Sequence, residues 1–310
     1  MTVNTIDPRE FMQPKVLEDV VNKKLETIPS FINMFPTVPA DGTSVTYHED
    51  LVTAGADIEN GTMGKPMDLG ELSGLAKIEV SPITQKHGYL RPFGYEFRIS
   101  KRDLDTSSII DDLTRGVGRA VYGMAKRIND DILNILKTVS NDVTEPGSAW
   151  TAWDADGATP LSNMLDIANA MDLEGYDSEA NQLYLQQDNY YELLDYVENV
   201  DIAWVQNPMN NGSRQIPQIN GFNIHKLKGT SQLATGAYLA LDGRPEYAPI
   251  TTYTRTQRDF SSDKDFPIVN IFQYKEKPGS YNEQVVTEFI AETFYAPKAP
   301  NSVCYRSSGV

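Results

Sequence analysis

The chain has 310 residues, of which 40% are hydrophobic and 23% are charged, a balance typical of a globular protein with a sizeable core. Its formal net charge of −16 argues against a protein that reads nucleic acid through a basic face. We expect no membrane span and no signal peptide, because long apolar runs are absent, and the single cysteine excludes an internal disulfide framework.

Residues 1–42 are predicted to form an extended arm, because five prolines interrupt them. One short helix is expected at residues 16–26. The apolar side chains of Phe31, Ile32 and Phe35 follow in a segment with little regular structure. Such a segment must be buried, either in the core of its own chain or against a neighbouring molecule.

Residues 43–102 show period-two patterning on both sides of a glycine-rich middle. Ile78 and Val80 alternate with polar residues, and Tyr95, Phe97 and Ile99 do the same further along. This pattern predicts extended two-stranded ribbons around a long turn-rich tip. A ribbon with one polar face and one thinly apolar face cannot form a core of its own, so we expect it to need an outside partner.

Residues 103–139 carry the longest helical pattern in the chain. The apolar residues recur at steps of three and four, which is the period of one helix face. We expect this face to pack against the mixed α/β part of the chain, and the other side to face solvent or a neighbour. The apolar stripe includes Val117, Val121, Met124 and Ile128, and the opposite side carries Arg115, Arg119, Lys126 and Asn129.

Three glycines, Gly116, Gly118 and Gly123, lie inside this predicted helix. Each costs about 1 kcal/mol relative to alanine. They indicate either a tolerated weakness or bend, or a place where small residues let another backbone approach closely.

Residues 140–160 are predicted to be a linker, and a mixed α/β pattern follows. Helices are expected at residues 160–171 and 188–197, and strands at 183–185, 222–227 and 238–241. Near the end, residues 268–274 and 284–295 predict a long β-hairpin, with one more strand at residues 303–305.

The sequence offers no local pattern for catalysis. It lacks a phosphate-binding loop, and Gly116 and Gly118 lie in a helix pattern rather than after a strand. His48, His87 and His225 are far apart and share no metal-ligand spacing, and Cys304 is expected to be a small packing residue. We therefore predict that the protein is not an enzyme, with no catalytic residue, no cofactor and no metal site.

The order of these parts resembles the major capsid protein of tailed viruses of bacteria or archaea, of the Hong Kong 97 type. The segments that carry the resemblance are residues 97–104 (FRISKRDL), 182–185 (QLYL), 216–224 (IPQINGFNI) and 294–297 (FYAP). The resemblance implies an α+β fold in five parts. These are an N-terminal arm at residues 1–42, an E-loop β-ribbon at 43–102, a P-domain spine helix and linker at 103–160, an A-domain with part of the P-domain at 161–265, and a C-terminal β-hairpin with a closing strand at 266–310.

The resemblance also implies a structural protein that self-assembles, as hexamers and pentamers, into an icosahedral shell around viral double-stranded DNA. Expected partners are a portal protein, separate scaffolding or decoration proteins, and DNA held without sequence-specific binding; no membrane is involved. The expected location is the virion, with assembly in the host cytoplasm. The expected inter-subunit contacts are Phe31, Ile32, Phe35, Ile78, Val80, Arg115 and Arg119.

Three alternatives remain open from the sequence. An encapsulin-like nanocompartment shares the implied fold. A tail or decoration component would be another virion protein, and a soluble enzyme with an unrecognised site belongs to a different class.

Overall fold

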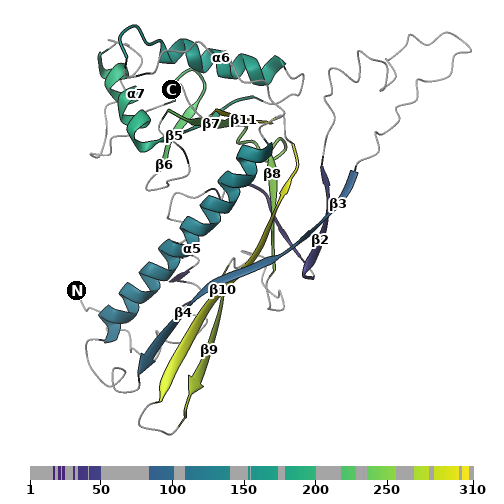
Figure 1. Ribbon diagram of the computed structural model, residues 1–310, viewed down its shortest axis with the longest axis vertical. Helices are drawn as coiled ribbons and strands as arrows, with labels where there is room; N and C mark the ends of the chain where they lie inside the picture. The colour runs from purple at the N-terminus through teal and green to yellow at the C-terminus, as the bar shows by residue number, and fades with distance from the viewer. Residues whose placement is uncertain are drawn as a thin grey trace, which may run out of the picture. The chain divides into compact units, whose positions relative to one another are not determined.

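The chain divides into two compact units. Unit 1 comprises Met1–Tyr47, His87–Ile132 and Thr252–Ala296, and unit 2 comprises His48–Lys86, Leu133–Thr251 and Pro297–Val310. Figure 1 shows the elements of the computed structural model. It describes residues 17, 20–21, 23–24, 31, 34–40, 42–49, 84–100, 109–139, 153, 155–173, 179–199, 218–227, 233, 236–255, 269–278, 283–299 and 302–306.

Unit 1 is built on a sheet whose central strand is β10 (Gln284–Pro297). β10 pairs antiparallel with β9 (Asn270–Glu276) on one side and with β4 (Arg91–Ser100) on the other. The sheet order is β1-β8-β10-β4, where β1 (Thr37–Pro39) runs parallel to β8 (Ile250–Thr254). The predicted late hairpin is confirmed as β9 and β10.

The alternating pattern at residues 95–99 is confirmed as part of β4, but its place in the predicted ribbon is wrong. Each of the ten residues of β4 has a partner in β10, from Arg91 opposite Thr293 to Ser100 opposite Gln284. The separate two-stranded sheet consists of β2 (Ser44–Glu49) and β3 (Thr84–Tyr89) alone. The predicted strand around Ile78 and Val80 lies outside the described residues.

The long helix α5 (Ile109–Val139) is confirmed, and so is its apolar stripe. Val117, Val121, Met124 and Ile128 are each at most 1% exposed. The expected partner was wrong, because the stripe from Val117 to Met124 packs within unit 1 rather than on the mixed α/β segment. The apolar face of α5 packs in one cluster with Val269, Ile271, Phe289 and Ala291, which lie in or next to β9 and β10. Leu17 and Val21, from the predicted N-terminal helix, belong to the same cluster.

The polar side of α5 also needs one correction. Arg115, Arg119 and Lys126 are exposed as expected, but Asn129 is only 8% exposed. The Oδ1 atom of Asn129 accepts a hydrogen bond of 3.0 Å from the backbone N–H of Phe31. A buried backbone donor needs such a partner, so Asn129 holds the arm segment to the helix.

Two of the three helix glycines make room for aromatic rings from β4. A Cβ added to Gly116 would lie 2.6 Å from the Phe97 ring, and one added to Gly123 would lie 2.5 Å from the Tyr95 hydroxyl oxygen. A Cβ added to Gly118 would meet no atom within 4 Å. The close approach of aromatic side chains therefore explains Gly116 and Gly123, where another backbone was expected to come near. Gly118 is consistent with a tolerated weakness of the helix.

This difference predicts opposite effects of two matched substitutions. Gly118→Ala is expected to stabilise the protein by about 1 kcal/mol, because alanine loses less backbone entropy in a helix. Gly116→Ala is expected to destabilise it by about 1–2 kcal/mol, because the methyl group overpacks against the half-buried Phe97 ring. Urea denaturation followed by circular dichroism measures both variants, and equal stabilisation by the two would show that Phe97 moves aside freely.

Unit 2 contains a four-stranded mixed sheet of order β11-β7-β5-β6. β5 and β6 are parallel and are joined through α7, so they form a βαβ unit, while β7 is antiparallel to both β5 and β11. The predicted elements of this region are confirmed. Their bounds are α6 (Pro160–Leu173), β5 (Gln182–Gln186), α7 (Gln187–Asn199), β6 (Asn223–Leu227), β7 (Tyr238–Leu241) and β11 (Val303–Arg306).

The core of unit 2 lies between this sheet and its two helices, which Figure 1 places together. Met164, Ile167 and Met171 come from α6, and Tyr190, Leu193 and Val197 come from α7. They pack on strand residues that include Leu183, Leu185, Tyr238 and Cys304. The short buried strands therefore owe their stability to helices on one side of the sheet, as expected for a small α/β layer. The C-terminal segment, predicted as one part, contributes β10 to unit 1 and β11 to unit 2.

Candidate functional site

The two histidines with described side chains each contact one polar side chain. The Nδ1 atom of His87 lies 3.1 Å from Oγ1 of Thr46 at an exposed position. His225 Nε2 lies 2.7 Å from Oε1 of Gln182, and its ring stacks on Tyr184 at 4.7 Å. Burial lowers the pKa of His225, so its neutral form is favoured. Among the described residues, neither histidine belongs to a group of side chains that could hold a metal ion.

Cys304 is confirmed as a packing residue. It is fully buried in the core of unit 2, and its Sγ atom lies 3.7 Å from the hydroxyl oxygen of Tyr238. A reactive cysteine needs a partly exposed, electropositive site. The surroundings of Cys304 supply neither.

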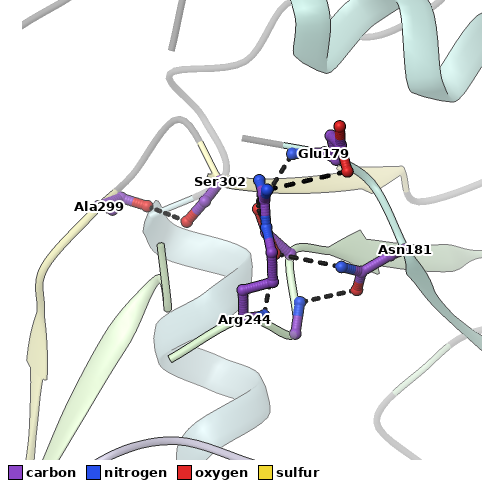
Figure 2. A network of polar contacts seen from close by, with 7 residues as sticks. Glu179, Asn181, Arg244, Ala299 and Ser302 are labelled. Carbon is purple, nitrogen blue, oxygen red and sulfur yellow. Dashed lines mark hydrogen bonds and ion pairs between the residues drawn. The ribbon is translucent and has the colours of Figure 1, made fainter. Parts of the chain in front are cut away.

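The most strongly connected polar group of unit 2 is the carboxylate of Asp242, which is 0% exposed. It follows β7 and accepts hydrogen bonds from the backbone N–H of Glu179, at 3.0 Å, and from Nδ2 of Asn181, at 3.2 Å. Arg244 donates to it from its backbone N–H at 2.9 Å, from Nε at 3.0 Å and from Nη2 at 2.6 Å. Figure 2 shows how Asn181, Glu179 and Arg244 converge on this turn.

The Asp242 network joins three segments that are far apart in the sequence. The backbone N–H of Asp242 donates to the carbonyl oxygen of Ser302 at 3.0 Å, and the N–H of Gly243 donates to Oδ1 of Asn181 at 2.8 Å. The start of β5, the end of β7 and the start of β11 are thereby fixed to one another. The side-chain hydrogen bond to Asp242 raises the pKa of Arg244.

This network is suited to holding the sheet together rather than to catalysis. Five donors occupy the two oxygens of Asp242, so no lone pair points to a bound molecule. The remaining pair of Arg244 with Glu179, at 3.8 Å, contributes little because the Glu179 side chain is 72% exposed. In the part of the chain that the structure describes, no three His, Cys, Asp or Glu side chains lie close enough to hold a metal ion.

The predicted contact residues fall into two groups. Arg115 and Arg119 lie exposed on the outer face of α5, where Tyr122 is 57% exposed. Sequence reasoning did not select Tyr122, although its spacing of three residues from Arg119 places it on the same face. Arg115 and Arg119 stay predicted inter-subunit contacts, and Tyr122 adds an exposed aromatic ring to the same face.

Phe31 and Phe35 are buried within their own chain. They are 2% and 4% exposed, and their rings stack with centroids 6.3 Å apart. Their predicted contact with a neighbouring subunit stays a prediction. Ile32, Ile78 and Val80 lie outside the described residues, so their contacts stay predictions.

None of the described helices combines the length and apolar character that a membrane crossing requires. The Asp242 network links strand ends of unit 2, which is a structural role.

Comparisons with known proteins indicate the family of the chain. The sequence profile of a family described as phage capsid protein matches residues 85–271. No curated protein matches the sequence.

Several solved structures share the fold. A virus-like particle from Pyrococcus furiosus is 12% identical, with a TM-score of 0.55, over 94% of this chain and 97% of that chain. A structure from Microbacterium phage Oxtober96 is 10% identical, with a TM-score of 0.55, over 89% and 90% of the two chains. The mature capsid of bacteriophage PhiM1 is 11% identical, with a TM-score of 0.55, over 89% and 85%.

At these identities the structural likeness concerns the fold alone. The profile match carries the assignment, since it covers more than half of the chain. The protein therefore belongs to the phage capsid protein family and is a structural component of a virion shell.

Proposed function

We propose that the chain is the major capsid protein of a tailed virus with the Hong Kong 97 type of fold. Its copies self-assemble as hexamers and pentamers into an icosahedral shell that encloses double-stranded DNA. The observation that carries this proposal is the profile match over residues 85–271, which spans β4, α5 and the βαβ unit of unit 2. The likeness of fold to the PhiM1 capsid supports it independently.

In this proposal unit 1 corresponds to the P-domain with its spine helix, and the α/β part of unit 2 corresponds to the A-domain. The E-loop is the segment that begins at β2 and returns through β3. The net charge of −16 suits a shell that holds DNA without binding it tightly, because phosphate contacts need cations. A portal protein and separate scaffolding or decoration proteins complete the particle, which is assembled in the host cytoplasm.

A second candidate is an encapsulin-like shell that encloses protein instead of a genome. The likeness to the virus-like particle from Pyrococcus furiosus, over 97% of that chain, supports a shell of this size and fold. The two candidates differ in their contents. Nuclease-protected DNA inside native particles supports the capsid, whereas an enclosed protein identified by mass spectrometry supports the nanocompartment.

The self-assembly is tested by purifying the chain and imaging it by negative-stain electron microscopy. Uniform closed shells are expected from the wild-type protein. A variant in which a short Gly/Ser linker replaces residues 52–83 is expected to keep the circular dichroism spectrum of the folded subunit but to form no shells. The reason is that a two-stranded ribbon is too small to be a core and is therefore expected to act between subunits.

Two outcomes would contradict these expectations. A wild-type protein that stays monomeric under all assembly conditions would overturn self-assembly by this chain alone. Shells of normal size from the linker variant would show that the ribbon is not an assembly element.

A further inference from the structure

The outer face of α5 carries a stripe of cations in a strongly acidic chain. Arg115, Arg119, Tyr122 and Lys126 follow one another at steps of four, three and four, and all are exposed. These residues, called here the α5 stripe, lie opposite the buried face formed by Val117, Val121 and Met124. Among the described side chains, none forms an ion pair with the three cations of the stripe.

The α5 stripe has the composition of a protein interface. Arginine and tyrosine are enriched in interface cores, and they dominate the residues whose loss weakens binding most. Gly118 lies beside the stripe, and a Cβ there would meet no atom, so a partner can approach the helix backbone. Because the chain has a net charge of −16, its own acidic surfaces are the natural complement of this stripe.

The outer face of α6 in unit 2 is such a surface. Ser162, Leu165, Asp166, Asn169 and Asp172, called here the α6 stripe, are all exposed, and Leu165 is 58% exposed. α6 contains no lysine or arginine in its 14 residues. The acidic face of α7 is less available, because Lys226 already covers Tyr191, with its Nζ atom 3.0 Å from the tyrosine hydroxyl oxygen.

The two stripes are similar in length, and their charges are complementary from Tyr122 to Arg115. At 1.5 Å per residue, the α5 stripe is about 16 Å long and the α6 stripe about 15 Å long. When the helices run antiparallel with Leu165 opposite Tyr122, Asp172 lies opposite Arg115, and Asp166 lies between Tyr122 and Arg119. One apolar contact thereby lies at one end of the pairing, and the two pairs of opposite charge, Asp166 with Arg119 and Asp172 with Arg115, follow it on one side.

We propose that the α5 stripe of one subunit docks on the α6 stripe of a neighbouring copy of the same chain. The contact is heterologous, since each copy offers both stripes, and such contacts generate closed rings when the rotation between neighbouring copies closes. The proposal rests on the proposed shell function and names one of its interfaces. A second copy explains the stripe better than nucleic acid does, because a phosphate backbone offers no apolar partner for Tyr122.

Charge reversal tests this pairing. The variants Arg115→Asp/Arg119→Asp and Asp166→Arg/Asp172→Arg are each expected to reduce the fraction of chain that sediments as shells by at least about tenfold, because like charges then face each other. The variant that carries all four reversals is expected to restore shells. Thermal melting of the unassembled subunits serves as the folding control, since all four positions are exposed.

The outcomes separate the pairing from the shell function itself. If the wild type forms shells and Asp166→Arg/Asp172→Arg forms them undiminished, the α5–α6 pairing is overturned. If, in addition, only Arg115→Asp/Arg119→Asp loses shells and is retained more weakly on DNA, the α5 stripe binds phosphates instead. Failure of the fourfold variant to restore shells also overturns the pairing. If the wild type forms no shells, the α5–α6 pairing is tested by mixing Arg115→Cys chains with Asp172→Cys chains under oxidising conditions. A disulfide that joins an Arg115→Cys chain to an Asp172→Cys chain supports the contact, and its absence overturns the contact. Cys304 is buried and does not compete in that reaction.

Discussion

Val121→Asp is expected to yield protein that is insoluble or unfolded. Val121 is 1% exposed and packs with Val117, Met124 and Phe289 in the core of unit 1. A carboxylate there would be buried without a partner, which costs several kcal/mol, comparable with the whole stability of a domain. Soluble expression and thermal melting by circular dichroism measure the effect.

Arg119→Ala is the matched control on the same helix, two residues earlier. Its side chain is exposed on the outer face, where a single charge contributes little to stability. Melting of the subunit is therefore expected to stay within a few degrees of wild type, whereas shell formation is weakened if the α5 stripe docks on a neighbour. A soluble Val121→Asp protein with wild-type melting would show that the apolar face of α5 is not buried, and the assignment of α5 as a spine helix would fail.

Asp242→Ala is expected to lower the free energy of unfolding by about 3 kcal/mol, since removing one partner of a buried pair leaves the other groups without compensation. The backbone N–H of Glu179 and Nδ2 of Asn181 would both lose their acceptor. Urea denaturation followed by tryptophan fluorescence is a suitable measurement, because Trp153 is buried in the core of unit 2.

Glu179→Ala is the control for this network. It removes the exposed carboxylate that lies 3.8 Å from Arg244 but keeps the backbone N–H that donates to Asp242. Its effect is expected to stay below about 1 kcal/mol, and Asp242→Asn is expected to fall between the two, because an amide keeps one acceptor oxygen. Equal stability of Asp242→Ala and Glu179→Ala would show that the network does not hold the strands together.

The Val121→Asp and Asp242→Ala predictions concern the rigidity of the subunit, on which shell assembly depends. A shell protein presents the same surfaces in every copy, so the elements that carry those surfaces must keep a fixed shape. The core under Val121 supports the outer face of α5, and the Asp242 network fixes the ends of β5, β7 and β11 in unit 2. Damage at either place is expected to reach assembly through the shape of the subunit.

The sequence by itself determined the elements that have a local signature. The three-and-four spacing from Val117 to Ile128 predicted α5 and its buried face, since this period belongs to a helix wherever it packs. The alternation at Tyr95, Phe97 and Ile99 predicted a strand, and the short apolar run at 183–185 predicted β5. The order of these elements also sufficed for the resemblance to tailed-virus capsid proteins, which the profile match places in the phage capsid family.

Only the tertiary structure decided which surfaces these elements meet, because that depends on residues distant in the sequence. Asn129 has a polar side chain on the expected outer side of α5, yet the Phe31 backbone, 98 residues earlier, buries it. The apolar side chains of Phe31 and Phe35 predicted burial, but only the structure showed that residues of their own chain cover them. Gly116 and Gly118 have identical side chains and differ only because β4 brings the Phe97 ring to one of them. Asp242 was one of 43 carboxylates in the sequence, and it became the centre of a network only where three strand ends met.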